Sequence, residues 1–352
     1  MKSYKVVGVM SGTSLDGLDI ALCEFSKNSH NWNGKILKAD TIAYSQQWRE
    51  RLDNANQLSG YELIKLDTEF GHFIGTEIKK FLSKKKGKAD FISSHGHTVY
   101  HQPAEKITFQ LGNGAAIAAA ASLTTISNFR VLDVALHGQG APLVPIGDQM
   151  LFSDYDYCLN LGGFANVSYS WYKKRIAYDV CPVNIVINRL AQQLGHEYDK
   201  DGELARQGKI NDALLKELNK IDYYNTPAPK SLGREWVDDV FNGVLAKHKC
   251  SITDQLRTIY EHIAFQMYRV FSGTASKKIL LTGGGTHNKF LVELIGNRIE
   301  YKLAIPEKEI IDFKEAYIFA FLGVLRMRQE YNCLSSVTGA RHDNVGGNIF
   351  II

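Results

Sequence analysis

Three glycine-rich segments, each directly after a short apolar segment, constrain the fold of this chain more than any other feature. The apolar segments cover residues 4–10, 157–161 and 278–282, and their β-branched and aromatic residues are typical of buried strands. The segments that follow them are SGTSLDG (11–17), LGGFAN (161–166) and TGGGTHN (282–288). Strands that end in glycine turns and alternate with helical stretches predict an α/β fold.

The order of the predicted elements repeats once along the 352 residues. Each cycle opens with a strand, a glycine turn, two further strands and a helix. The first cycle has strands at 4–10, 20–25, 36–44, 91–94 and 108–111, with helices at 61–82 and 114–121. The second has strands at 157–161, 165–171, 176–179 and 278–282, with helices at 183–194, 252–271, 288–298 and 315–328. We therefore predict two domains, 1–145 and 146–333, with the tail from about 334 to 352 as a candidate to return to the first.

Glycine turns at strand ends are suited to binding phosphate. Without a Cβ the backbone approaches an anion closely, and successive N–H groups form an anion-binding concavity. Two common nucleotide folds do not fit the sequence. It has no GxxxxGK[ST] segment, and GVMSG (8–12) has the wrong spacing for GxGxxG and precedes a strand rather than a helix. Each turn alone is weak support for a ligand, because hairpins use the same residues.

Composition narrows the choice of partners. The formal charge is only +4 and the basic residues are dispersed, so we expect no nucleic-acid partner. No stretch reaches the roughly 18 apolar residues that a membrane span requires, and residues 1–14 do not resemble a signal peptide. The five cysteines are widely spaced without a CxxC pair, which favours reduced thiols and a cytoplasmic location.

Five motifs in chain order resemble those of the anhydro-N-acetylmuramic acid kinases, which belong to the actin-like ATPase superfamily. They are GVMSGTSLDGLD (8–19), SHGHTVYH (94–101), GQGAPLVP (138–145), NLGGFAN (160–166) and TGGG (282–285). The resemblance therefore covers nearly the whole chain. It implies two actin-like (ribonuclease H-like) domains with mixed sheets flanked by helices, with ATP in the cleft between them. It also suggests a homodimer.

The resemblance implies a reaction and a set of ATP-binding residues. The family couples hydrolytic opening of a 1,6-anhydro ring to phosphorylation at O6, giving N-acetylmuramic acid 6-phosphate in cell-wall recycling. The cofactors are then ATP and Mg²⁺, and the other substrate is a small sugar. The implied ATP-binding residues are Gly12, Thr13, Ser14, Leu15, Asp16, Gly17, Asp19, Gly162, Gly163, Asn166, Gly283, Gly284, Gly285 and Asn288.

The family's catalytic aspartate corresponds to Asp179, in DVCPVN (179–184), where the family usually has DTGPGN. A carboxylate there would act as general base toward the attacking water. The implied sugar-binding residues are His97, Arg130, Asn184 and Glu315. His97 replaces a glutamine, and NFRVLD (128–133) replaces DFRRRD with the loss of two basic residues. The catalytic aspartate and one arginine are kept, so the same kinase chemistry is expected. The departures leave the identity of the acceptor sugar undecided.

Other interpretations of the same residues stay open. Taken alone, Asp179 is better explained as a capping or ion-paired residue. Asp16 and Asp19 are acidic candidates near the metal, although Mg²⁺ bound to phosphates requires no protein ligand. The spacing of His95, His97 and His101 suits some zinc sites, but a fourth ligand is not evident, and we predict no protein metal centre. The alternatives in function are a kinase that deprotonates a hydroxyl of another amino sugar and a non-catalytic ATP-binding protein of the actin-like class.

Overall fold

The computed structural model describes residues 3–12, 15–29, 31–272, 278–299 and 302–352. The chain divides into two compact units. Unit 1 comprises Met1–Leu151 and Phe313–Ile352, and unit 2 comprises Phe152–Asp312. The division at Leu151 lies close to the predicted boundary at 145. The return to unit 1 begins at Phe313, well before the predicted start near 334.

Unit 1 is built on a seven-stranded sheet in the order β12-β6-β4-β1-β2-β3, with β5 paired to β4. Its first three strands form an antiparallel meander, and β4 and β6 then join parallel to β1 and β4. The bounds are β1 Ser3–Ser11, β2 Gly17–Lys27, β3 Trp32–Ala43, β4 Phe91–Gln102, β5 Ile107–Leu111, β6 Thr125–Ser127 and β12 Asn348–Phe350.

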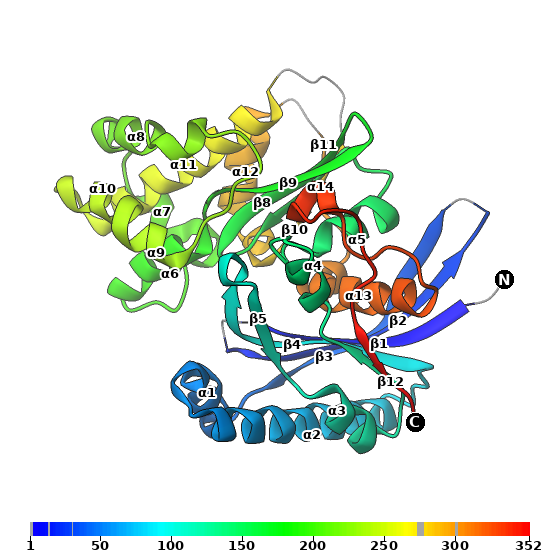
Figure 1. The fold of residues 1–352 in the computed structure, drawn as a ribbon. Helices are drawn as coiled ribbons and strands as arrows, with labels where there is room; N and C mark the ends of the chain where they lie inside the picture. The colour runs from blue at the N-terminus through cyan, green and yellow to red at the C-terminus, as the bar shows by residue number, and fades with distance from the viewer. Residues whose placement is uncertain (1–2, 13–14, 30, 273–277, 300–301) are drawn as a thin grey trace. The chain divides into compact units, whose positions relative to one another are not determined.

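Helices cover both faces of this sheet (Figure 1). On one face Val7 and Val9 of β1 share a buried cluster with Phe70 and Ile74 of α2. On the other face α13 lies so close to β1 that a Cβ at Gly8 would collide with the carbonyl of Ala316. The helices of unit 1 are α1 Gln46–Asp53, α2 Gly60–Lys84, α3 Gly114–Ala121, α4 Val131–Ala135, α5 Val144–Leu151, α14 Ser335–Thr338 and the part of α13 (Lys308–Met327) after Asp312.

Packing of α13 against the sheet of unit 1 explains where the chain returns to this unit. Helix α13 has a non-helical residue at Phe313, at the limit between the units. Beyond it, Tyr317 stacks on Phe25 of β2 with ring centroids 5.2 Å apart, and Phe321 packs on Phe25 in a tilted arrangement at 5.3 Å. The apolar face of the predicted helix at 315–328 therefore packs on the first sheet, although it follows the second sheet in sequence.

Unit 2 repeats the same topology on a five-stranded sheet in the order β11-β10-β7-β8-β9. Strands β7, β8 and β9 form the meander, while β10 runs parallel to β7 and to β11. The strands are β7 Tyr157–Leu161, β8 Phe164–Trp171, β9 Lys174–Pro182, β10 Lys278–Thr282 and β11 Lys302–Ala304. The two meanders, each followed by two parallel strands, confirm an α/β fold with mixed sheets and the predicted internal repeat.

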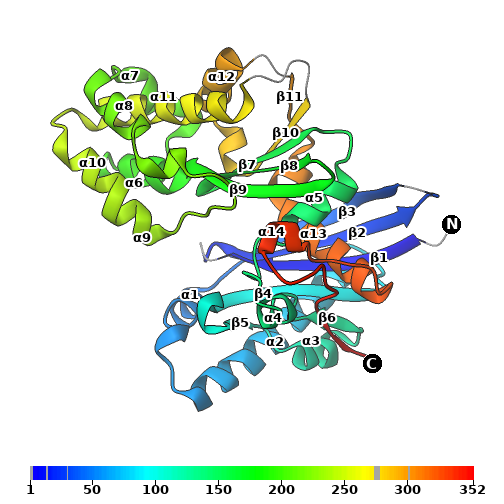
Figure 2. The ribbon, with the colours of Figure 1, turned by 45° about the horizontal axis from the view of Figure 1, so that its top comes forward.

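The helices of unit 2 include α11, whose buried side chains pack in the same core as β7 and β8 (Figure 2). The helices are α6 Asn184–Gln193, α7 Glu203–Gln207, α8 Asp212–Asn219, α9 Arg234–Trp236, α10 Asn242–Lys247, α11 Ile252–Phe271 and α12 Lys289–Arg298. A π-helical turn at Val237–Phe241 joins α9 to α10, and 3₁₀ turns lie at Ala55–Gln57, Pro103–Glu105, Lys200–Gly202, Asp222–Asn225 and Gly284–His287.

Most predicted elements agree with the structure to within a few residues. Strand β4 continues past the predicted end at Ser94 to Gln102, because residues 97–102 pair with β5. The elements that were not predicted are short, each of eight residues or fewer, and are helices α1, α4, α5, α7 to α10 and α14 and strands β6, β11 and β12.

Candidate active site

The catalytic candidate Asp179 lies on the edge strand β9, beside a bulge at Val180. Its Oδ2 accepts a hydrogen bond of 2.9 Å from the backbone N–H of Leu232. Among the described residues, no donor is in hydrogen-bond contact with Oδ1. Burial raises the pKa of the Asp179 carboxyl, and the Leu232 N–H partly opposes that shift. A half-buried carboxylate with one oxygen unpaired and a raised pKa suits a general base.

The segment 223–232 holds Asp179 through its backbone as well. The Tyr223 hydroxyl donates to the Asp179 carbonyl at 2.6 Å, and the Asp179 N–H donates to the Lys230 carbonyl at 3.2 Å. Sequence reasoning did not identify Tyr223, Lys230 or Leu232, because a backbone contact across this distance leaves no motif. The side-chain contact of Asp179 is thus to the loop residue Leu232, which precedes α9, and not to the N-terminus of a helix.

The two glycine turns of unit 2 lie together at the C-terminal ends of the adjacent parallel strands β7 and β10. The carbonyls of Gly162 and Gly163 accept the N–H groups of Val183, Asn184 and Ile185, so they cap the start of α6. The side chain of Asn184 bonds the Leu161 carbonyl at 3.4 Å. The structure therefore brings Asn184 next to the first turn and also near the second, since a Cβ on Gly285 would lie 3.5 Å from its Oδ1.

The glycines of these two turns differ in whether the protein's own backbone and packing require a glycine. Gly283 has a φ of +84°, and a Cβ on Gly285 would lie 2.8 Å from the Cβ of Leu161, so both are required by the turn itself. A Cβ on Gly163 or Gly284 would meet nothing closer than 3.9 Å. Packing does not require glycine at Gly163 or Gly284, and close approach of a ligand would explain it.

Two asparagines predicted to contact ATP have different surroundings. Asn166 is exposed on β8 and pairs in register with Asp179. Asn288 is the N-cap of α12 and accepts from the Leu291 N–H, while its amide donates to Tyr260 and to the Asp199 carbonyl. The side chain of Asn288 is thereby engaged in supporting the turn.

In unit 1 the predicted phosphate turn joins β1 to β2. Thr13 and Ser14 lie outside the described residues. The Leu15 N–H donates to the Gly12 carbonyl at 3.3 Å, and Leu15 has a φ of +60°. A Cβ on Gly17 would lie 2.7 Å from the Ile42 carbonyl oxygen, so β3 requires glycine there. Asp16 is exposed beside this turn.

Asp19 lies on β2 and His97 on β4, the two strands that flank β1 in the sheet of unit 1. Asp19 Oδ1 accepts from Thr41 at 2.6 Å. His97 is buried, with its Nδ1 3.0 Å from the hydroxyl of Ser11, which accepts from Tyr44. Burial lowers the pKa of His97 to about 4, so its imidazole is neutral at physiological pH. Because Tyr44 donates to Ser11, the Ser11 hydrogen is available for Nδ1, and Nε2 then carries the ring proton.

Arg130 is positioned by two of the sequence motifs. Its Nε donates to Nε2 of His95 at 2.9 Å, and its Nη1 donates to the Gly140 carbonyl at 2.6 Å. Burial lowers the pKa of Arg130 to about 10, and the nearby Glu315 carboxylate opposes that shift. Arg130 therefore stays charged at neutral pH. The sequence singled out His95 only as a metal ligand candidate, and the structure gives it a different contact.

Glu315 and Asp133 complete the surroundings of Arg130. Part of the Glu315 side chain is exposed to solvent, but many protein atoms surround it and partly desolvate its carboxyl. This desolvation raises the pKa of the Glu315 carboxyl, and the charge of Arg130 lowers it. Asp133 is fully buried and accepts from the Gly140 N–H, which fixes the loop that binds Arg130. Its other oxygen accepts from Cys333, Thr338 and Asn344. Asp133 is therefore structural, and the unit 1 candidates Arg130 and Glu315 lie near each other.

No group of three or more metal-ligating side chains occurs in the part of the chain that the structure describes. Mg²⁺ usually retains waters and binds to phosphates with one or two carboxylates, so Asp16 and Asp19 fit such an ion held mainly by a nucleotide. Within the described ranges, no helix is both long and apolar enough to cross a bilayer.

Comparisons with known proteins agree with the motifs. The family described as anhydro-N-acetylmuramic acid kinase matches residues 4–352. The enzyme of that name from Clostridioides difficile (strain 630) is 33% identical, covering 97% of each chain. The one from Francisella tularensis subsp. novicida (strain U112) is 34% identical over 99% of each chain, and that from Synechococcus elongatus is 34% identical over 98% of this chain and 99% of its own.

Among solved structures, the activator of 2-hydroxyisocaproyl-CoA dehydratase from Clostridium difficile with bound ADPNP is similar at a TM-score of 0.45. It is 11% identical and covers 92% of this chain and 97% of its own. No conclusion about function follows from a similarity of that degree. The family match spans almost the whole chain, and the relatives are covered nearly end to end. The chain therefore belongs to the anhydro-N-acetylmuramic acid kinase family.

Proposed function

We propose that this chain uses ATP and water to convert 1,6-anhydro-N-acetylmuramic acid to N-acetylmuramic acid 6-phosphate and ADP, a step of cell-wall recycling. Water adds to the anomeric carbon as the bond from that carbon to O6 breaks. O6 forms a bond to the γ-phosphorus as the bond to the β-phosphate oxygen breaks. The proton released by the water is taken up by a base. Membership of the kinase family supports this reaction.

Asp179 is the proposed base, and its arrangement carries the chemical argument. Oδ2 is held by the Leu232 N–H, which leaves Oδ1 to accept a proton from water. The raised pKa of the carboxyl brings it nearer to neutral pH, where proton transfer from water is less unfavourable. Asn166, its register partner on β8, is exposed and suited to orienting a substrate or phosphate oxygen.

For ATP we assign the turn at 12–19 in unit 1 and the turns at Gly162–Gly163 and Gly283–Gly285 in unit 2. The two glycines that packing does not require, Gly163 and Gly284, are the proposed points of closest approach. When bound with ATP, Mg²⁺ would neutralise charge on the phosphates, and Asp16 and Asp19 are the carboxylates placed to assist.

For the sugar we assign Arg130, His97 and Glu315 of unit 1 and Asn184 of unit 2. Arg130 is the proposed partner of the lactyl carboxylate, because a guanidinium binds a carboxylate through two parallel hydrogen bonds. Nε donates its one hydrogen to His95 and Nη1 donates one of its two to Gly140, so the second Nη1 hydrogen and the Nη2 group are left for a carboxylate. The neutral His97 would donate through Nε2 to a sugar oxygen, in the place of the family's usual glutamine.

The experiment follows ADP release with purified full-length protein, ATP, Mg²⁺ and a panel of anhydro-sugars, with ³¹P NMR of the product. We expect release only with a 1,6-anhydro-amino sugar. In ¹⁸O water, ring opening places one solvent oxygen on the anomeric carbon. A sugar phosphate without that oxygen would instead indicate a kinase that acts on a pre-existing hydroxyl.

The variant Asp179→Asn should bind ATP nearly as the wild type does and lose at least about two orders of magnitude in turnover. Retention of more than a tenth of wild-type turnover would remove Asp179 from this role. The family resemblance also suggests a homodimer, and the spacing of the cysteines favours a cytoplasmic location. Light scattering on the purified protein tests the oligomeric state.

A further inference from the structure

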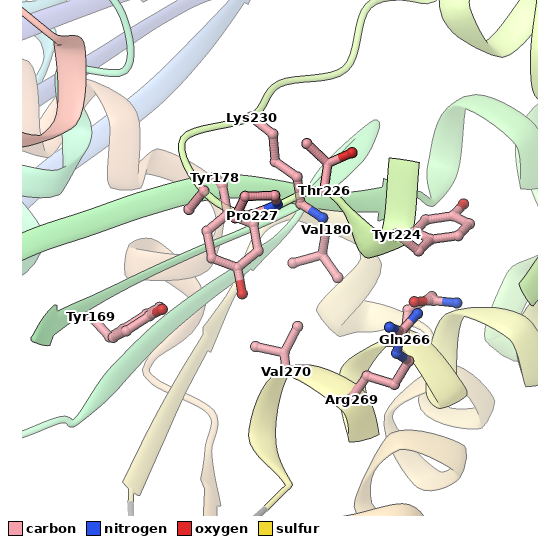
Figure 3. Close-up of a pocket in the computed structure, with 11 residues that line it drawn as sticks. Tyr169, Tyr178, Val180, Tyr224, Thr226, Pro227, Lys230, Gln266, Arg269 and Val270 are labelled. Carbon is pink, nitrogen blue, oxygen red and sulfur yellow. The ribbon is translucent and has the colours of Figure 1, made fainter. Parts of the chain in front are cut away.

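A pocket of about 210 Å³ lies wholly within unit 2, beside β9 and under the segment 224–230 (Figure 3). Tyr178 and Val180 line it from β9, on either side of Asp179, whose own side chain does not. The remaining lining residues come from β8, the loop and α11, and are Tyr169, Tyr224, Thr226, Pro227, Ala228, Lys230, Gln266, Arg269 and Val270. No residue assigned above to ATP or sugar lines this pocket.

Two cationic side chains line the pocket without a carboxylate. Lys230 donates to the Tyr223 carbonyl at 3.0 Å, with its ammonium 5.6 Å from the ring centre of Tyr178. Arg269 donates from Nη2 to Asn225 at 3.0 Å. Within the described ranges, neither forms an ion pair with an aspartate or glutamate. Desolvation lowers the pKa of Lys230, and the charge of Arg269 adds to that shift, so two like charges share one site.

The pocket also offers hydroxyl groups and flat apolar walls. Burial raises the pKa of Tyr178 and that of Tyr169, so both phenols stay protonated and can donate hydrogen bonds. In Figure 3 the Tyr178 hydroxyl points into the space between Tyr169 and Val270, and the guanidinium of Arg269 lies on the other side near Gln266. The cations and hydroxyls therefore surround a largely polar space, which Thr226 and Gln266 also line, with apolar walls at Val180, Pro227, Ala228 and Val270.

We propose that this pocket binds a small phosphomonoester, with the phosphate between Lys230 and Arg269 and its organic part against Tyr169 and Val270. An ammonium with three rotatable donors and a guanidinium fork together match the several oxygens of a phosphate. An anion there would also relieve the repulsion between the two cations. The pocket volume of about 210 Å³ lies below the 300 Å³ or more of typical drug-sized ligand sites, so we expect a ligand of the size of a sugar phosphate or inorganic phosphate.

Occupancy of the pocket is coupled to Asp179 through the segment that forms its wall. Asp179 forms one hydrogen bond with each of three residues, Tyr223, Lys230 and Leu232. These residues lie at or next to the ends of the lining segment 224–230. A ligand that draws Lys230 toward a phosphate shifts the backbone that holds the carboxylate. This coupling rests on the proposed role of Asp179, whereas binding in the pocket does not.

Binding is tested by calorimetry on the full chain with three probes, inorganic phosphate, N-acetylglucosamine 6-phosphate and N-acetylglucosamine. A saturating non-hydrolysable ATP analogue is present throughout, so that the phosphate-binding turns are occupied. We expect millimolar or tighter binding of at least one phosphate probe and none of the unphosphorylated sugar. Preference between the two phosphate probes decides whether an organic phosphate or free phosphate is the ligand.

The double variant Lys230→Gln/Arg269→Gln should weaken this binding at least about tenfold, and Val270→Phe should block it by filling the pocket. Lys216→Gln, which removes one positive charge at an exposed position of α8, is the control for the loss of a surface cation and should bind as the wild type does. Thermal unfolding verifies that each variant is folded. Wild-type affinity in both pocket variants, or equal binding of the unphosphorylated sugar, would overturn the site.

Turnover with and without the bound phosphate probe tests the coupling. We expect turnover to change by about fivefold or more at saturation, the lower end of the range of typical allosteric couplings between binding sites, and this change should vanish in the double variant. Loss of the effect in the single variant Arg269→Gln with normal basal turnover supports the pocket as the origin, because Arg269 lies outside the segment 223–232 that holds Asp179. If the probe binds and turnover does not change, the coupling to Asp179 is wrong, while the kinase reaction itself stays supported by the basal activity.

Discussion

The Nε of Arg130 donates a hydrogen bond of 2.9 Å to Nε2 of His95. Nδ1 of the same ring lies 2.9 Å from the Gly96 carbonyl, which can only accept, so the ring proton is on Nδ1. Burial lowers the pKa of His95 well below its usual value, and the charge of Arg130 adds to this. A neutral histidine of fixed tautomer therefore holds the arginine, and we propose that His95 is a positioning residue.

Replacement of His95 by leucine should impair recognition of the sugar more than the chemical step. The Nε donor of Arg130 would lose its partner, which costs about 1–3 kcal/mol when the group is buried. We expect the KM for the anhydro-sugar to rise about tenfold and kcat to change little. Initial-rate kinetics at saturating ATP measure both. His95→Gln, which restores an acceptor, should recover most of the loss, and failure of that rescue would argue for a packing role.

Arg130→Ala should discriminate between two sugars. Because Arg130 is proposed to bind the lactyl carboxylate, we expect a large rise in the KM for 1,6-anhydro-N-acetylmuramic acid. The KM for anhydro-N-acetylglucosamine, which lacks the lactyl group, should rise much less. Arg130→Lys should not rescue, since one ammonium cannot replace the fork that bonds His95, Gly140 and a ligand together. Equal effects on both sugars would make Arg130 purely structural.

The acid limb of kcat/KM should report the carboxyl of Asp179. A base acts only when it is ionised, and its raised pKa means that activity falls at a higher pH than for an ordinary aspartate. Leu232→Pro removes the N–H that stabilises the ionised form, so the limb should move further toward higher pH. Leu232→Ala keeps that N–H and should leave the limb in place. If the acid limb of the proline variant lies at the same pH as in the wild type, the group that titrates is not Asp179.

The glycines of unit 2 predict opposite outcomes for two alanine variants. Gly285→Ala introduces a Cβ 2.8 Å from Leu161, and we expect the free energy of unfolding to fall by about 1–3 kcal/mol. Gly163→Ala has open space and should change the free energy of unfolding by less than about 0.5 kcal/mol, but raise the KM for ATP. Denaturant unfolding and ATP titrations measure the two quantities. Normal ATP kinetics in Gly163→Ala would exclude close approach of the nucleotide there.

Local patterns in the sequence were sufficient to predict much of the fold of this protein. Buried strands followed by glycine turns, repeated in two cycles, were sufficient to predict an α/β fold with two similar units, because strand and helix periodicities depend on neighbouring residues. The long helix at 252–271 and the strand at 278–282 were predicted to the residue. The motifs likewise identified the family and the candidates Asp179 and Arg130, because these residue types occur in fixed local patterns.

Only the tertiary structure decided what those candidates contact. Leu232 lies 53 residues from Asp179, and His95 lies 35 residues from Arg130, so no local pattern encodes either hydrogen bond. The return of the chain to unit 1 at Phe313 could not be predicted for the same reason. The apolar face of a helix does not specify which of the two sheets it will pack on. Spacing in the sequence brings a side chain to one face or end of an element. The packing of distant elements then determines whether its donors and acceptors are engaged or left free for a substrate.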